Sequence, residues 1–187
     1  MVASTSNLDK VRYLTIIRLI MLTVRDLPTP EVLHRFAQRY PDADVSAVSA
    51  FLTLLRTATE LSQALDAFLA RHGLLQGRWW VLILLFREES LESSPSVLAD
   101  KAGVTRATMT GLLDGLERDG LVQRVFDAED RRRTTVRLLP AGQAVLDAVM
   151  PDYYRRVRAL MKGLNEEQRT LMKSMLGSLR GAADVFA

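Results

Sequence analysis

The chain of 187 residues contains no cysteine and only two histidines, and these scarcities exclude several kinds of site. Without thiols there is no disulfide, no zinc–thiolate centre and no thiol-based redox sensor, and a reducing compartment is the natural setting. Because His34 and His72 are the only imidazoles, a dedicated metal sensor is not expected. We therefore predict a protein without a metal or another cofactor.

The sequence also has only a small excess of positive over negative charge, and it lacks the common enzyme motifs. Lysine and arginine exceed aspartate and glutamate by only 25 to 22, so binding to nucleic acid would depend on local charge placement. The sequence has no nucleophile elbow, phosphate-binding loop, zinc signature or histidine-centred triad. The adjacent carboxylates of Glu166 and Glu167 are interpreted as capping and solvating a helix. We expect a protein that is not an enzyme.

No hydrophobic run is long enough for a membrane span. The most apolar stretch, residues 13–24, is short for that purpose and carries Arg18 in its middle. Asp9, Arg12, Thr15 and Arg18 recur every third residue and form one narrow polar stripe on an otherwise apolar helix, which predicts a helix buried against protein. The first ten residues lack the basic start and cleavage site of a signal peptide. We expect a cytoplasmic protein with no membrane partner.

Helical periodicity dominates what is present. The run "WWVLILLF" is apolar on every face, and its eight residues would also fit a buried strand. Its polar flanks extend it to helix length, so we favour a helix that is buried on all sides. Capping residues and glycine or proline stops predict helices over residues 8–25, 30–40, 44–71, 76–89 and 140–163, with a last helix after the capping residue Asn165.

A helix-turn-helix is predicted between residues 95 and 120. Pro95 starts a short helix that Gly103 ends, and Thr105 caps a second helix that runs to about Asp119 before Gly120. Two helices joined by a tight turn that contains glycine form this motif. The residues expected on its inward face are Ala99, Val104, Met109, Leu112, Leu113 and Leu116.

Two β-rich runs, "LVQRVF" and "TTVRLL", follow the helix-turn-helix and predict a hairpin with an arginine-rich tip. The expected fold is therefore mainly α with a small β wing. In a winged helix the second helix of the pair enters the DNA major groove, and the wing tip reaches the minor groove or the backbone. We interpret Arg132 as the groove reader, Asp130 as the residue that orients it, and Arg131 and Arg133 as phosphate contacts. The alternative is a solvated hairpin with exchanging salt bridges.

The segment from Leu98 to Gly142 resembles the MarR family of bacterial transcription regulators. The helix pair "VLADKAGVTRATMTGLLDGLERDGLVQR" and the wing "DAEDRRRTTVRLLPAG" carry the resemblance, and "HGLLQGRWWVLILL" is similar to the lead-in of that family. The resemblance implies a homodimer that binds double-stranded DNA at a pseudo-palindromic operator, most commonly as a repressor. It also implies three regions, with dimerisation helices over 1–72, a winged helix-turn-helix lobe over 73–140 and further dimerisation helices over 141–187.

The resemblance assigns DNA contacts to the start of the recognition helix, residues 105–119, beside those of the wing, residues 121–139. Arg106 is the expected base reader, since arginine can bond bidentately to guanine, and Thr108 and Thr110 suit phosphate or methyl contacts. Thr105 is either a further DNA contact or only the helix cap. Arg124 either touches a phosphate or pairs with a local carboxylate.

This sequence departs from the family pattern in three places. Gly111 and Gly115 stand inside the recognition helix, where the family often has bulkier or basic residues, and each costs about 1 kcal/mol relative to alanine. Residues 1–43 extend the amino terminus, and we predict that they form an added pair of helices that clasps the dimer. Pro140 replaces a common threonine at a helix start, where proline is tolerated.

The family also senses small molecules, which predicts an aromatic or anionic effector in a cleft. The residues expected to line it are Phe68, His72, Arg78, Trp79 and Trp80, with Tyr153 or Tyr154. In the alternative interpretation the tryptophans are plain core and His72 is a cap or surface residue. The alternative function is a winged helix that contacts other proteins without binding specific DNA.

Overall fold

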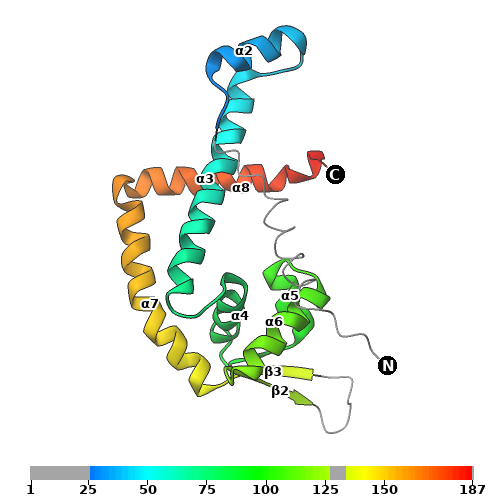
Figure 1. Ribbon diagram of the computed structural model, residues 1–187, viewed down its shortest axis with the longest axis vertical. Coiled ribbons are helices and arrows are strands. Elements are labelled where there is room, and N and C mark those ends of the chain that lie inside the picture. Colours follow the sequence, from blue (N-terminus) through cyan, green and yellow to red (C-terminus); the bar gives the residue numbers. More distant parts are fainter. Residues whose placement is uncertain (1–25, 127–133, 187) are drawn as a thin grey trace. The chain divides into compact units, whose positions relative to one another are not determined.

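The computed structural model describes residues 26–126 and 134–186 (Figure 1). The chain divides into two units, Met1–Ala70 and Arg71–Ala187. The helix predicted over residues 8–25 lies outside the described residues, and so do Asp130 and the three wing arginines, Arg131 to Arg133.

The described part of the first unit is a pair of helices, α2 (Pro30–Arg39) and α3 (Val45–Ala70). The Thr29 side chain caps α2 by accepting a hydrogen bond from the Val32 amide at 3.4 Å, and Pro30 occupies the first helical position. Both helices were predicted, and both are confirmed. α2 packs against α3 and contributes one buried side chain, that of Leu33.

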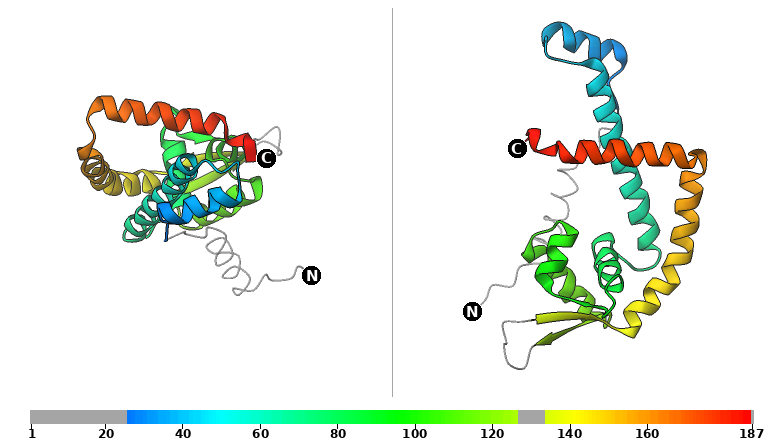
Figure 2. Two further views of the ribbon diagram at one scale, coloured as in Figure 1. Left: turned by 90° about the horizontal axis from the view of Figure 1, so that it is seen from above. Right: turned by 180° about the vertical axis from the view of Figure 1, so that it is seen from behind.

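The second unit contains the predicted helix-turn-helix and hairpin (Figures 1 and 2). Its elements are α4 (Gln76–Phe86), β1 (Glu92–Ser93), α5 (Pro95–Ala102), α6 (Arg106–Arg118), β2 (Val122–Phe126), β3 (Thr134–Leu138), α7 (Pro140–Leu160), a 3-10 turn (Met161–Gly163), α8 (Glu166–Gly181) and a second 3-10 turn (Ala183–Phe186). The expected fold class, mainly helical with a small antiparallel sheet, is confirmed.

The sheet has the strand order β1-β3-β2, and all of its pairings are antiparallel. The hairpin register places Val122 opposite Leu138 and Phe126 opposite Thr134. The third strand, β1, was not predicted; it pairs Glu92 with Arg137 across the other edge of β3. The wing is therefore tied to the chain segment that precedes the helix-turn-helix.

Local caps explain where the two motif helices begin and end. The Ser94 hydroxyl accepts from the Val97 amide at 3.3 Å at the start of α5, and Gly103 ends that helix in the left-handed region at φ 66°. Thr105 then caps α6, as predicted. Only glycine adopts this left-handed conformation without strain, so the tight turn needs it at 103.

The core of the second unit is built around α4, which contacts α5, α6, α7 and the strands β1 and β3. The prediction of a helix over the "WWVLILLF" run is confirmed. The expectation that it is buried on all sides is wrong, because Trp80 is 41% exposed and Phe86 is 48% exposed. The buried apolar side chains of this unit are Leu74, Trp79, Val81, Leu82, Leu84, Leu85, Leu98, Ala99, Met109, Leu113, Leu116, Val122, Val136, Leu138, Leu146 and Val149.

The carboxyl-terminal helices also begin where the sequence predicts. Pro140 is at the first turn of α7, and a Cβ at Gly142 would lie 2.4 Å from the Leu121 carbonyl oxygen, so glycine allows α7 to start against the hairpin. Asn165 and Gln168 form a reciprocal capping box on α8, which leaves α7 at a steep angle (Figure 2). Among the described helices, none combines the length and the hydropathy needed to cross a membrane.

Candidate nucleic-acid interface

The first turn of α6 is organised by threonine hydroxyls. Thr105 Oγ1 accepts a hydrogen bond from the Thr108 amide at 3.1 Å and lies 2.9 Å from Thr108 Oγ1. The capping alternative for Thr105 is thereby confirmed, and its contact with DNA stays a prediction. Thr110 is exposed, and its hydroxyl donates to the Arg106 carbonyl at 2.9 Å.

One ridge of α6 is exposed, and it carries Arg106, Thr110, Gly111 and Asp114. The opposite side of the helix is buried in the core of the lobe. Arg106 has no ion-pair partner within residues 26–126 and 134–186, so its guanidinium is free to meet a ligand on this ridge. The helix N-terminus next to it adds a positive partial charge, which favours an anionic partner.

Arg124 of β2 joins the wing to the recognition helix. Its Nη1 donates to Glu117 Oε2 and its Nη2 to Asp114 Oδ1, both at 2.6 Å, while its backbone N–H donates to Glu117 Oε1 at 2.8 Å. Burial acts to lower the pKa of the guanidinium, but the hydrogen bonds to Asp114 and Glu117 outweigh it and raise that pKa. The predicted pairing with local carboxylates is confirmed, and a phosphate contact by Arg124 stays a prediction.

The same clamp changes the electrostatics of the α6 surface. Asp114 and Glu117 would otherwise present two negative charges on a helix expected to approach phosphates. Arg124 compensates for part of this charge from the side of β2, so the exposed ridge is less repulsive toward a polyanion. Sequence reasoning did not identify the two carboxylates as functional, although their spacing of one helical turn was a visible signal.

Trp79 and Trp80, two residues of the predicted effector site, belong to an aromatic cluster between α4 and α7. Trp79 is buried and its ring centroid lies 4.9 Å from that of Tyr153 in an edge-on arrangement. Trp80 lies 4.7 Å from Trp79, and Tyr154 lies 5.6 Å from Tyr153. The buried Trp79 Nε1 has no hydrogen-bond partner in the described residues. The core alternative is therefore confirmed for Trp79, whereas the exposed Trp80 is not core.

The remaining residues of that predicted site are spread over different elements. Arg78 forms an ion pair with Asp119 beyond the end of α6, at 2.7 Å. His72 is exposed in the turn that follows Ala70, and Phe68 is buried near the end of α3 in the first unit. Within the second unit, the structure brings the two tryptophans and the two tyrosines together.

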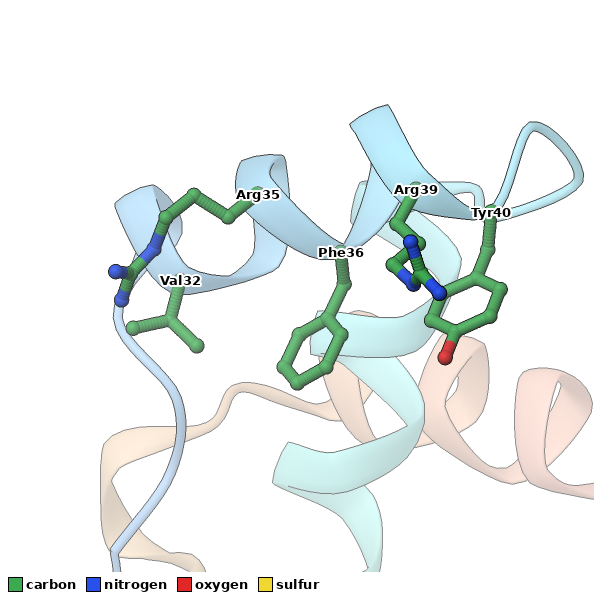
Figure 3. A pocket seen from close by; sticks show the side chains of 5 residues that line it. All are labelled: Val32, Arg35, Phe36, Arg39 and Tyr40. Carbon is green, nitrogen blue, oxygen red and sulfur yellow. The ribbon is translucent and has the colours of Figure 1, made fainter.

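A shallow hollow lies on α2, in the segment predicted as an amino-terminal extension (Figure 3). Phe36 and Tyr40 stack along it with ring centroids 6.5 Å apart. Arg35 and Arg39 share this face with Val32. Sequence reasoning missed it, although the two aromatics and the two arginines are each spaced by four residues and therefore lie on one helix face.

A helix-turn-helix, the β2–β3 hairpin that follows it and the short strand β1 that precedes it define a winged-helix lobe. Comparison with known proteins identifies its family. Residues 72–133 match the MarR family. The chain is 32% identical over 165 residues to the transcriptional repressor YetL of Bacillus subtilis. The aligned region covers 88% of this chain and 99% of YetL. The chain belongs to the MarR family of transcriptional regulators.

Two solved structures extend this likeness. Sco3205 of Streptomyces coelicolor, a MarR family regulator determined in complex with DNA, aligns with a TM-score of 0.67 at 24% identity over 71% of this chain and 84% of its own. That likeness concerns the fold. NadR, determined in complex with 4-hydroxyphenylacetate, aligns with a TM-score of 0.56 at 26% identity over 68% of this chain and 89% of its own.

Proposed function

We propose that this regulator is a repressor that binds a pseudo-palindromic operator as a homodimer, with α6 in the major groove and the wing at the minor groove. The observation that carries the proposal is the exposed ridge of α6. Among the described residues Arg106 has no ion-pair partner there, and Arg124 compensates the carboxylates of Asp114 and Glu117 further along the helix. The repressor activity named for YetL and the DNA bound to Sco3205 support the same assignment.

Residue roles follow from the chemistry of each side chain. Arg106 reads a guanine through two parallel hydrogen bonds, and Thr108 and Thr110 contact phosphates or thymine methyl groups. In the wing, Asp130 orients Arg132 toward the minor groove, and the flanking arginines bind phosphates. Arg124 acts mainly behind this surface, because its donors are engaged by α6.

The homodimer is supported by helices that lack a buried face within one chain. No residue of α8 is buried, and its apolar side chains form one stripe on the helix surface. A single 16-residue helix of this kind gains little from folding alone, since tertiary packing supplies most helical stability. A second copy of the chain covers this stripe, whose exposed residues are Leu171, Met175, Leu176 and Leu179.

A small aromatic or anionic effector releases the protein from DNA in this proposal. The aromatic cluster of α4 and α7 supports it, and so does the 4-hydroxyphenylacetate bound to NadR. His72 and Trp80 of the second unit remain proposed effector contacts and Phe68 stays a prediction, whereas Arg78 is engaged by Asp119. Tryptophan fluorescence titrated with a panel of aromatic acids tests this part, and an unchanged spectrum across the panel would argue against a pocket.

The decisive experiment measures binding to DNA from upstream of the protein's own gene by fluorescence anisotropy across a salt series. Wild type is compared with Arg106→Ala and Arg132→Ala, and with Arg118→Ala as a control that removes an arginine from the far end of α6. Arg106→Ala is expected to cost about 1–3 kcal/mol and to relax specificity at one base pair of each half-site. The control should retain most of the affinity.

A second outcome favours the alternative function. If neither this DNA nor a randomised pool is bound, the exposed ridge serves no groove, and the lobe is a protein–protein interaction module. A shallow salt dependence of any residual binding would support that alternative, because few counterions would be released.

A further inference from the structure

We propose that Arg78 is a positioning residue for the recognition helix and that Gly115 exists to let its guanidinium pass across α6. The inference rests on the proposed DNA-binding function and adds to it a device that fixes how α6 is presented. It also replaces the sequence-based expectation that Arg78 contacts an effector.

The contact between Arg78 and Gly115 is unusually close. Gly115 is buried, and a Cβ built there would lie 2.1 Å from Arg78 Nη2, 2.6 Å from Cζ and 2.8 Å from Nε. The guanidinium therefore lies in the space that any other residue at 115 would fill. From there Nη1 reaches Asp119 Oδ2 at 2.7 Å, with the Arg78 side chain only 20% exposed.

A second glycine brings the same two helices together one residue earlier on α4. A Cβ at Gly77 would lie 3.1 Å from Leu112 Cδ2. Leu112, Gly115 and Asp119 follow one another at spacings of three and four, so they lie along one face of α6. Two consecutive residues of α4 thus engage three successive points on the recognition helix, which determines both its rotation and its tilt.

The contact between Arg78 and Asp119 lies at one end of α6, so a small tilt there displaces the opposite end, which carries Arg106. Asp119 follows the last residue of α6, and Arg106 is its first, so the contact and the base reader are at opposite ends. A helix of this length spans about 20 Å, and a tilt of about 10° around one end displaces the other by about 3 Å. A displacement of that size removes a bidentate hydrogen bond, whose donor and acceptor must lie within about 3 Å.

The proposal also explains a glycine that local preference disfavours. Glycine in a helix interior is destabilising relative to alanine. Gly111, on the same helix, has no atom within 4 Å of a built Cβ, so alanine is accommodated there. Gly111 is therefore the matched control for the effect of alanine on helix stability without the contact to Arg78.

The test measures affinity for operator DNA and for a randomised pool, beside thermal stability, for Arg78→Ala, Arg78→Lys and Gly115→Ala. Arg78→Ala is expected to weaken operator binding about tenfold or more while randomised DNA is bound as before, because the phosphate contacts persist. Arg78→Lys should recover part of the loss, since its ammonium can cross Gly115 to Asp119. Lys101→Ala, which removes an ion pair with Glu88 away from α6, should change neither affinity.

Gly115→Ala supplies an independent check on the geometry. In wild type it should displace the guanidinium and reproduce the loss of operator binding seen in Arg78→Ala. In the Arg78→Ala background it should cause no further loss and should raise the melting temperature, as is also expected for Gly111→Ala. Additive losses of affinity in the double variant would overturn the proposal.

Two further outcomes separate this inference from the proposed function. If wild type binds operator and Arg78→Ala binds it equally well, or loses operator and randomised DNA together in step with stability, Arg78 is only structural. If wild type binds neither DNA, the proposed function fails and the positioning role falls with it. The stability cycle at Gly115 then still reports whether the contact itself exists.

Discussion

Two helices of the second unit, α4 and α8, both carry large apolar side chains, yet the environments of these side chains are opposite. α4 has 11 residues, and Trp79, Val81, Leu82, Leu84 and Leu85 are buried in the core of its own lobe. α8 has 16 residues and none that is buried. Apolar content therefore predicts that a helix will be covered, but not whether its own chain covers it. The core of the lobe is buried within one chain, whereas the apolar side chains of α8 stay exposed in the single chain.

The contrast between α4 and α8 is tested most directly by placing charges on the apolar stripe of α8. Leu171→Glu combined with Leu179→Glu is expected to leave a monomer at micromolar concentrations and to abolish operator binding, because one lobe reads only one half-site. Sedimentation gives the mass and anisotropy gives the affinity. Thr170→Glu, on the opposite face of α8, is the control. A dimer that survives the double substitution would contradict the proposed interface.

In the monomeric variant, the stability cost of a substitution in the core can be compared with that of a substitution in α8. Leu113 is fully buried in α6, so Leu113→Ala should lower the free energy of unfolding by about 2–5 kcal/mol through lost contacts and a cavity. Leu176→Ala in α8 should then cost far less, since its side chain is 42% exposed in the single chain. Urea unfolding measures both, and equal costs would show that α8 is covered by its own chain.

The clamp between the wing and α6 should have an intermediate effect. Arg124→Met leaves Asp114 and Glu117 without their shared cation, which is expected to cost about 1–2 kcal/mol of stability and to weaken DNA binding at all salt concentrations. Arg137→Met is the matched control on β3, because Arg137 pairs only with Glu92 among the described residues. Similar losses in both variants would reduce Arg124 to an ordinary surface arginine.

The capping box of α8 should contribute less. Asn165 Oδ1 accepts from the Gln168 amide at 2.8 Å, and the Asn165 amide donates to Gln168 Oε1 at 2.9 Å. Asn165→Ala should cost about 1 kcal/mol, while Asn165→Asp, which keeps an acceptor at the cap, should cost almost nothing. Thermal unfolding of the full protein measures the difference, and an unaffected alanine variant would show that packing alone sets where α8 begins.

The smallest expected effect is a pH dependence at Asp152. Hydrogen bonds from Arg155 and Arg156 lower the pKa of its carboxyl below the ordinary value of 3.8. Because the folded pKa is depressed, the stabilisation is complete above the ordinary pKa and is lost as the pH falls through the folded pKa. Melting temperatures between pH 5 and pH 2.5 should therefore fall slightly more steeply for wild type than for Asp152→Asn. Parallel curves would mean that the two ion pairs contribute nothing.

Features encoded by neighbouring residues were predictable from the sequence. The caps at Thr29, Thr105 and Asn165 each satisfy an amide three residues away, so their signal is local and the helices begin where expected. The choice of helix over strand for the run around Trp79 was also correct, since its polar flanks extended the segment beyond the length of a usual strand. Its exposed side could not be predicted, because a run that is apolar on every face carries no polar stripe.

Features that depend on distant residues were missed or left open. β1 has only two residues and is a strand only because it pairs with β3, so no local sequence pattern predicts it. The ion pair between Arg78 and Asp119 joins positions 41 apart in the chain. The glycine that accommodates it did stand out in the sequence, as a small residue where bulk was expected. An unexplained glycine inside a helix is therefore a signal to search for a side chain from another element.

The pairing of β1 with β3 has a consequence for how the lobe folds. Glu92 and Arg137 face each other although they are 45 residues apart, and the whole helix-turn-helix lies in the loop between them. Closing a loop of that length is entropically costly, so we expect α5 and α6 to form early and this strand pair to close late. On the ribosome the lobe cannot complete until β3 has emerged. A growing chain that stops before Thr134 therefore carries a recognition helix without the sheet that secures it.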